Sequence, residues 1–295
     1  MEIRPAVVAD AESAVALYEL VEPYLVCTVG GVRSSISLAG GSRARVSLAA
    51  VQDGEVIGWS SAALIAGSDP VSAQLRVLVH PEHRGHGAGT ELLEATHARL
   101  KNAGAQSVRV FADPKSVDWA SRWGYVQTRQ VYYAGIEPRL APAMPEVPSA
   151  VRLMPLAEVD PRGVYEADEV AQRTKPGDAK ITSRPYDDWL AAVWKAPEMV
   201  LDLSVAALHG DRVIGFTLGN GDHHKIWSQM TATMPEYRGR GLAKLVKCAA
   251  LHRAADAGVV GAYTANYDGN EPMIAVNEWL GYHRTTTHSV LVCPL

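Results

Sequence analysis

The spacing of hydrophobic positions changes several times along the chain, and each change marks an expected element. Residues 44–64 alternate between apolar and polar on both sides of Asp53-Gly54, which predicts two strands joined by a hairpin turn. Residues 87–103 place Leu92, Leu93 and Leu100 on one side of a helix that should stop at Gly104. The rest of the first half predicts strands at 2–4, 74–81, 107–112 and 125–133, a helix within 10–25 and a short helix ending at 123–124.

The same order of elements then begins again. Strands are predicted at 150–156, on both sides of 209–211, at 225–235, at 260–266 and in the tail, and helices at 164–172, 185–193, 241–257 and 271–280. The stretch PEHRGHGAGT at Pro81 has a counterpart, PEYRGRGLAK, at Pro235, 154 residues later (235 − 81). A repeat of this length indicates two copies of one domain and not a solenoid, whose period is far shorter.

Prolines at 138, 142, 145 and 148 separate the two copies. Proline at this density continues neither a helix nor a central strand, so it favours a linker. We therefore predict domains at 1–136 and 151–295, joined by a linker at 137–150.

Composition narrows the class of protein. The net charge of −4 without a long basic run disfavours nucleic-acid binding, and no apolar run reaches the length of a membrane span. The three cysteines, at 27, 248 and 293, fit a reducing compartment, and we expect a cytoplasmic protein. Because two linked copies can mimic a dimer within one chain, we expect a monomer, with a dimer as the alternative.

Each copy runs from a strand through Arg-Gly-x-Gly into a helix. Glycines allow a tight turn with uncovered N–H groups, and the helix adds its own unpaired N–H groups and its dipole, which together favour a phosphate or pyrophosphate. A nucleotide-binding P-loop needs Gly-Lys, which does not occur in the chain, and a dinucleotide fingerprint needs a third glycine where Thr90 and Lys244 stand.

The doubled turn resembles the signature of the GCN5-related N-acetyltransferases (GNAT), Arg/Gln-x-x-Gly-x-Gly/Ala after a strand, and the order of elements is similar in both halves. The resemblance implies an α/β (α+β) fold of two tandem domains, each a mixed, mainly antiparallel twisted sheet flanked by helices. It also implies that acetyl-CoA binds at the turn. The cofactor-binding residues implied for the second copy are Thr233, Met234, Arg238, Gly239, Arg240, Gly241, Leu242 and Ala243.

A second segment, TANYDGNEPMIAVNEWLGY, resembles an asparagine-rich stretch of tandem acetyltransferases. Asn266, Asn270 and Asn277 have amides that suit the pantetheine amides of CoA, although Asn270 can equally cap the helix that follows it. The first half has Asp113-Pro114 at the corresponding place, so we predict catalysis in the second domain. The first copy either binds CoA too or serves as a scaffold; its candidate residues are Val79, Arg84, Gly85, His86, Gly87, Ala88, Gly89 and Thr90.

The proton-transfer groups are harder to assign. Many family members place a tyrosine four residues before the final Gly-aromatic pair as general acid, and this chain has Ala120 and Asn277 there. Strand alternation predicts Trp227, Gln229, Thr231 and Thr233 on one face, without a carboxylate or histidine among them. The candidate catalytic residues are therefore His223, His224 and Tyr267, with a backbone N–H near Thr233 polarising the thioester carbonyl.

The sequence favours an acetyl-CoA-dependent N-acetyltransferase. Direct attack by a primary amine of a small molecule is the mechanism that the resemblance implies, and an amino sugar, an antibiotic or an amino acid is the expected kind of acceptor. We expect no metal, because His80, His83 and His86 flank the phosphate turn without an evident fourth ligand. The alternative is a non-catalytic protein that binds or senses acyl-CoA.

Overall fold

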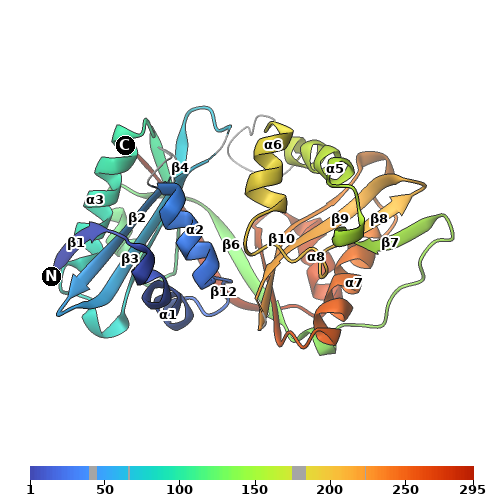
Figure 1. Cartoon of the computed structure of the whole chain (residues 1–295), viewed down its shortest axis with the longest axis horizontal. Helices are drawn as coiled ribbons and strands as arrows, with labels where there is room; N and C mark the ends of the chain where they lie inside the picture. The colour runs from blue at the N-terminus through green and yellow to red at the C-terminus, as the bar shows by residue number, and fades with distance from the viewer. Residues whose placement is uncertain (40–44, 66, 175–183, 223) are drawn as a thin grey trace. The chain divides into compact units, whose positions relative to one another are not determined.

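The computed structural model describes residues 1–39, 45–65, 67–174, 184–222 and 224–295, and it divides into two compact units (Figure 1). Unit 1 comprises Met1–Gln130 with His288–Leu295, and unit 2 comprises Val131–Thr287. Each unit is a mixed sheet with helices on both faces, which confirms the predicted fold class. No helix in the described residues is long and apolar enough to cross a membrane.

Unit 1 has its strands in the order β1-β2-β3-β4-β5, and the end of β12 pairs with β5. Helices α1 and α2 pack on one another and on β2 and β3, and α3 covers the other face of the sheet. Its elements are β1 (Glu2–Pro5), α1 (Ala11–Val21), α2 (Val29–Ala39), β2 (Arg45–Gln52), β3 (Glu55–Leu64), β4 (Ser72–Val79), α3 (Ala88–Asn102), β5 (Ser107–Ala112) and α4 (Val117–Ser121).

Unit 2 has the order β6-β11-β10-β9-β8-β7. Helices α5 and α6 pack together on one face and α7 covers the other, above β8, β9 and β10. Its elements are β7 (Val151–Pro155), α5 (Pro161–Thr174), α6 (Tyr186–Trp189), β8 (Val205–His209), β9 (Arg212–Gly221), β10 (Lys225–Thr233), α7 (Leu242–Asp256), β11 (Gly261–Tyr267) and α8 (Glu271–Trp279).

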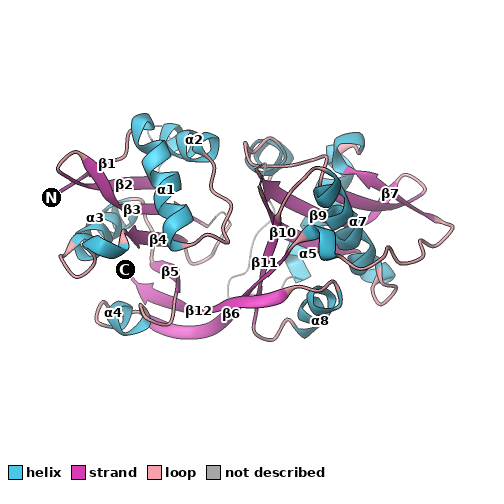
Figure 2. Cartoon of the chain, turned by 90° about the horizontal axis from the view of Figure 1, so that it is seen from below, coloured by secondary structure: helices cyan, strands magenta, loops and turns pink. Residues whose placement is uncertain are grey.

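Two strands begin in one unit and end in the other. β6 (Val126–Ile136) starts in unit 1 and pairs with β11 of unit 2, and β12 (His283–Pro294) starts in unit 2 and pairs with β5 of unit 1 (Figure 2). The units therefore do not divide at the predicted boundaries of 1–136 and 151–295. Hydrophobic period locates a strand but does not say which sheet receives it, so the exchange leaves no local signal.

The proline-rich segment also differs from a free linker. After a short 3₁₀ turn at Pro138–Leu140 it has no helix or strand up to residue 150, as predicted. Yet it packs against α7: the Pro142 carbonyl lies 2.9 Å from His252 Nε2 and accepts from the Cys248 thiol at 3.4 Å. These residues belong to unit 2 and not to a flexible connection.

The predicted helix within 10–25 is confirmed as α1, and α2 follows it as a second, unpredicted helix. Asp10 or Ser13 would be the expected cap of α1 from the sequence. Asp10 does not cap α1 with its side chain. Its carboxylate accepts from Arg4 at 2.7 and 2.8 Å and from the Val7 N–H at 2.8 Å, and these bonds hold the pKa of Asp10 below its ordinary value. Helix α2 escaped prediction because Gly30, Gly31 and three serines weaken its apolar pattern.

Candidate functional site in unit 2

Strands β10 and β11 pair only at one end and then separate. Their parallel register covers Lys225–Trp227 against Gly261–Tyr263 and stops there. A β-bulge between Ser228 and Met230 follows at once in β10. Bulges bend a strand and are common beside active sites. The result is a wedge-shaped opening in the sheet, closed at Trp227 and open toward the glycine turn.

The bulge overturns the predicted alternation on β10. Trp227 contacts the ring of Tyr133, with centroids 5.9 Å apart. Thr231 Oγ1 lies 2.9 Å from Thr217 Oγ1 and 3.5 Å from Ser228 Oγ, so Thr231 faces the same way as Ser228 and opposite to Trp227. The extra residue, Gln229, is exposed. An extra residue reverses the inward and outward faces downstream of it, which periodicity alone cannot foresee.

The wedge exposes backbone donors. The Met234 N–H donates to the Ile214 carbonyl at 2.9 Å, so the backbone N–H of Met234 points toward β9. Because successive residues of a strand direct their backbone groups to opposite sides, the N–H and C=O of Thr233 point away from β9. Arg238 Nε donates to that carbonyl at 3.2 Å. The N–H predicted to polarise a carbonyl is therefore directed into the wedge.

The glycine turn leads from the open end of the wedge into α7. Gly239 and Gly241 have φ of 76° and 78°, a left-handed conformation that a side chain disfavours, and a Cβ at either would meet only open space. The first backbone bond into the helix runs from the Leu245 N–H to the Gly241 carbonyl at 3.1 Å. The N–H groups of Leu242, Ala243 and Lys244 precede it and have no carbonyl within the helix, as at any helix start, and such groups can donate to an anion.

Unit 1 repeats this turn but differs around it. Arg84 Nε donates to the Val79 carbonyl at 3.2 Å, and Gly85 and Gly87 have φ of 80° and 94°. β4 and β5 also pair over only Ser72–Gln74, but β3 and β4 keep register without a bulge. The predicted residues of the first copy, Val79, Arg84, Gly85, His86, Gly87, Ala88, Gly89 and Thr90, therefore form a second, regular version of the turn.

Charge separates the two turns. At the first, Glu91 Oε1 lies 3.8 Å from the position that a Cβ of Gly87 would occupy. At the second, the equivalent of Glu91 is Leu245, and His86 and Thr90 are replaced by Arg240 and Lys244. Arg240 donates to the Glu236 carbonyl at 3.1 Å, and the Lys244 ammonium lies 4.7 Å from the centre of the Trp279 ring. An anion such as a diphosphate is therefore better accommodated in unit 2.

The predicted asparagines lie at the ends of β11 and α8. Asn277 Nδ2 donates to Asn266 Oδ1 at 2.6 Å, and Asn277 Oδ1 is buried without a hydrogen-bond partner. A buried amide oxygen without a donor is costly, and an amide N–H of a pantetheine arm would satisfy it. Asn270 precedes α8, but its side chain makes no capping hydrogen bond, so the predicted capping role is wrong. Its other predicted role, contact with CoA, stays a prediction.

The candidate catalytic residues do not gather in one place. His223 lies outside the described residues. His224 is exposed at the start of β10, beyond the closed end of the wedge, where its backbone N–H donates to Asp222 Oδ1 at 2.7 Å. Tyr267 ends β11 at the open end and is half-buried. Tyr267 therefore lies near the wedge, and His224 lies away from it.

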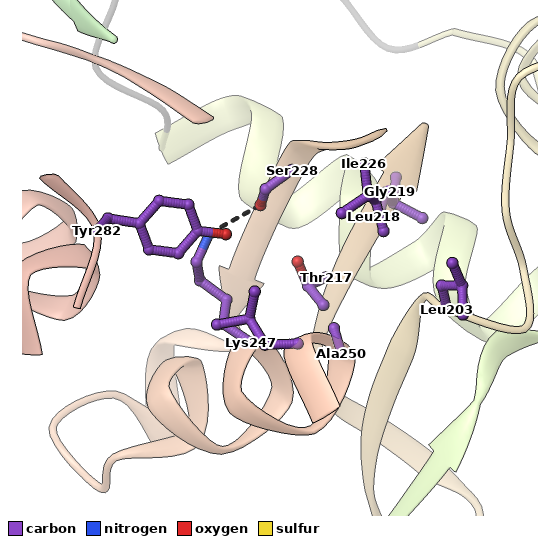
Figure 3. A pocket seen from close by; sticks show the side chains of 10 residues that line it. Leu203, Thr217, Leu218, Gly219, Ile226, Ser228, Lys247, Ala250 and Tyr282 are labelled. Carbon is purple, nitrogen blue, oxygen red and sulfur yellow. Dashed lines mark hydrogen bonds between the residues drawn. The ribbon is translucent and has the colours of Figure 1, made fainter. Parts of the chain in front are cut away.

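The residues that sequence reasoning missed are Lys247 and Ser228. Lys247 is buried in α7 and donates to Ser228 Oγ at 2.8 Å (Figure 3). The available signal was a lysine inside the apolar run LVKCAAL of the predicted helix. His80 and His83 contact each other's rings, and no cluster of three metal-ligating side chains occurs in the described ranges.

Both halves of the chain are similar in sequence to known proteins. The sequence profile of the Acetyltransferase (GNAT) family matches residues 12–125 and again 165–282. A mycothiol acetyltransferase of Nocardiopsis dassonvillei is 29% identical over 260 residues, 79% of this chain and 77% of its own, and one of Rhodococcus opacus is 28% identical over 86% of this chain and 84% of its own.

Solved structures agree in fold. A tandem GNAT protein from the clavulanic acid biosynthesis pathway superposes with a TM-score of 0.76 over 99% of this chain and 98% of its own, at 20% identity. A GCN5-related N-acetyltransferase from Sphaerobacter thermophilus gives 0.73 over 99% and 95%, at 19% identity. With the profile matching both halves, the chain belongs to the GNAT family of acetyltransferases as a member with two tandem domains.

Proposed function

We propose that the protein moves an acetyl group from acetyl-CoA to a primary amine of a small molecule, and that the transfer takes place in unit 2. The observation that carries this proposal is the wedge of unit 2, which combines a bulge, an inward Thr233 N–H and a cationic glycine turn. Unit 1 has the turn without the bulge and with Glu91 beside it.

The residues of unit 2 fit CoA. Gly239, Arg240, Gly241 and the first turn of α7 would hold its phosphates, and the orphaned Asn277 Oδ1 would accept from an amide of its pantetheine arm. When bound, acetyl-CoA supplies an activated acetyl thioester. The Thr233 N–H would stabilise negative charge on the carbonyl oxygen, and direct attack needs mainly a neutral amine held in line. Tyr267 is the best placed of the predicted acid–base residues.

The acceptor is proposed to be a small amine, and the protein to act as a monomer. Mycothiol acetyltransferases match most of this chain, so the acceptor amine of those enzymes is the first compound to test. Asn277 in the place of the family tyrosine argues against this acceptor, but one position does not outweigh similarity across 79% of the chain. Cys27, Cys248 and Cys293 form no disulfide with one another, which supports the cytoplasm as the proposed compartment.

Calorimetric titration of acetyl-CoA into wild type, Gly87→Asp and Gly241→Asp tests the cofactor site. Each substitution puts a carboxylate into one glycine turn. We expect Gly241→Asp to abolish binding and Gly87→Asp to leave it intact. Binding that survives Gly241→Asp would remove the site from unit 2.

Release of free thiol from acetyl-CoA, with a panel of amino sugars, amino acids and the acceptor of the mycothiol acetyltransferases, tests the reaction. Turnover that Gly241→Asp eliminates supports the enzyme. Tight binding of acetyl-CoA without turnover on any amine would favour the alternative, an acyl-CoA sensor, for which the missing tyrosine at Asn277 is the supporting observation.

A further inference from the structure

A lysine is buried behind the wedge without a counter-charge. Lys247 lies in the second turn of α7 with 3% of its surface exposed, and its Nζ donates to Ser228 Oγ at 2.8 Å (Figure 3). The same Nζ lies 5.2 Å from the centre of the Tyr282 ring. No described carboxylate forms an ion pair with it. A buried ammonium without an anion is unusual, because ammonium groups are almost always paired when buried.

The surroundings of Lys247 are apolar or neutral. It lines a small cavity between α7, β9 and β10, with room of about 20 Å³, about that of one water molecule. Tyr282 is the one other titratable group in the lining, and burial raises its pKa, so its phenol stays neutral. Apart from the hydroxyls of Thr217 and Ser228, the rest of the lining is apolar.

Ser228 connects this cavity to the wedge. It is the residue directly after the last parallel pair of β10 and β11, and the bulge begins at it. Its Oγ lies 3.5 Å from Thr231 Oγ1, which is 2.9 Å from Thr217 Oγ1. The direct hydrogen bond of the group is the one from Lys247 Nζ to Ser228 Oγ, so a proton can pass from the ammonium to the hydroxyl of the residue at which the wedge begins.

We propose that Lys247, acting through the Ser228 hydroxyl, returns a proton to the sulfur that leaves when the acetyl group is transferred. This rests on the function proposed above. As the amine nitrogen bonds to the acetyl carbon and the carbon–sulfur bond breaks, the electron pair of that bond stays on sulfur. Sulfur takes the hydroxyl proton of Ser228, Ser228 takes a proton from Lys247 Nζ, and the proton released by the acetylated nitrogen goes to solvent, which later recharges Lys247.

Acidity matches this role. Burial lowers the pKa of Lys247 from its ordinary 10.5 to about 7. A thiol has an ordinary pKa of about 8.5, so an ammonium of pKa about 7 protonates a thiolate favourably, and an ordinary lysine does not. The side of the sheet fits as well, because Lys247 belongs to the helix whose first turn holds the phosphates and not to the opposite face covered by α5. The role replaces that of the tyrosine missing at Asn277.

The first test is a nuclear magnetic resonance titration of Lys247 with ¹³C-labelled lysine. Desulfo-CoA is the matched probe, because it differs from CoA only in lacking the sulfur. We expect CoA to change the apparent pKa of Lys247 and desulfo-CoA to leave it as in the free protein. Equal effects of the two would overturn the proposal, since Lys247 would then not sense the sulfur. The Lys247→Met variant assigns the signal.

The second test compares kcat across pH for wild type, Lys247→Met and the exposed control Lys195→Met. Taking the ratio of wild type to variant cancels the titration of the acceptor. For Lys247→Met the ratio should be about 10²-fold at low pH, as for the loss of a proton donor. It should fall toward one above pH 7, where Lys247 has lost its proton, with KM for acetyl-CoA unchanged.

Ser228→Ala should reproduce this pH-dependent ratio, and Ser228→Thr, which keeps a hydroxyl, should restore activity. A ratio that rises with pH would make Lys247 a base, and a flat one would make it structural. Mass spectrometry that finds an acetyl group on Lys247 would make it a nucleophile. Each of these outcomes overturns the proposal and leaves the acetyltransferase function standing, whereas a wild type that never releases thiol refutes the function itself.

Discussion

Replacing Lys247 with methionine should stabilise unit 2, and the gain should depend on pH in a way that the structure specifies. Methionine keeps an unbranched side chain in the cavity and removes the charge. Lys247 is fully buried, and its pKa falls from 10.5 in the unfolded chain to about 7 in the folded one. The unfolded chain therefore holds the proton more tightly, and the free energy of unfolding rises with pH between about 7 and 10.5.

The size of the effect follows from that interval. Each pKa unit corresponds to about 1.4 kcal/mol, so the charge costs about 5 kcal/mol well below pH 7, about 4 kcal/mol at pH 7 and about 2 kcal/mol at pH 9. Methionine loses the bond to Ser228 and leaves that hydroxyl with only its 3.5 Å contact to Thr231, which costs about 1–2 kcal/mol. Lys247→Met should be more stable than wild type by about 2–3 kcal/mol at pH 7 and nearly equal at pH 9.

Hydrogen exchange of the α7 amides measures this without assuming that the two units unfold together. Opening free energies are compared at pH 7 and pH 9 for wild type, Lys247→Met and Lys195→Met, after correction for the intrinsic exchange rates. The control should show no difference that changes with pH. Two results would refute this reasoning: a difference in opening free energy between wild type and Lys247→Met that is the same at pH 7 and pH 9, or a variant less stable than wild type at pH 7. Either would show that burial does not lower the pKa of Lys247.

Three further predictions use other contacts. Asn277→Leu should weaken binding of acetyl-CoA about 10-fold in calorimetry, because it removes the orphaned Oδ1 as an acceptor, and equal affinity would show that this oxygen does not bind the ligand. Asp10→Asn should destabilise unit 1 by about 1–2 kcal/mol at pH 7. Since Arg4 lowers the pKa of Asp10 below 3.8, this stability is present above that pH and lost as the pH falls through the folded value, so acid denaturation curves of the two proteins should converge below pH 3.8. Trp189→Phe removes the buried bond from Nε1 to Asp168 Oδ2 (2.8 Å) and should cost about 1–3 kcal/mol in thermal unfolding, with an unchanged melting temperature as the contrary result.

The sequence predicts most strands and helices because their apolar periods are regular and their ends carry glycine signals. The two turns at Gly85–Gly87 and Gly239–Gly241 illustrate this, since each needs positive φ and each opens a helix. The asparagine contact between Asn266 and Asn277 was approached from the family pattern, and the structure adds the buried oxygen without a partner.

What the sequence did not predict depends on long-range packing. The bulge after Ser228 adds one residue to β10, and nothing in the local alternation distinguishes it from a regular strand. The environment of Lys247 is set by Ser228 and Tyr282, which are far from it in the chain. From the sequence alone, Lys247 is only a single charged residue within an apolar part of a predicted helix. The exchange of β6 and β12 likewise depends on which strand each one pairs with, and the hydrophobic period of a strand does not specify its partner.

That exchange constrains how the chain folds during its synthesis. The outer edge of β5 stays unpaired until residues 289–294 have left the ribosome, because these residues are its partner. Residues 131–136 are made near the middle of translation. They wait for residues 262–267 of β11, with which they pair, while over a hundred further residues are made. A nascent chain thus carries unpaired strand edges over a long part of translation, and such edges can pair with other chains during that time. Separate expression of either half would leave one edge open permanently.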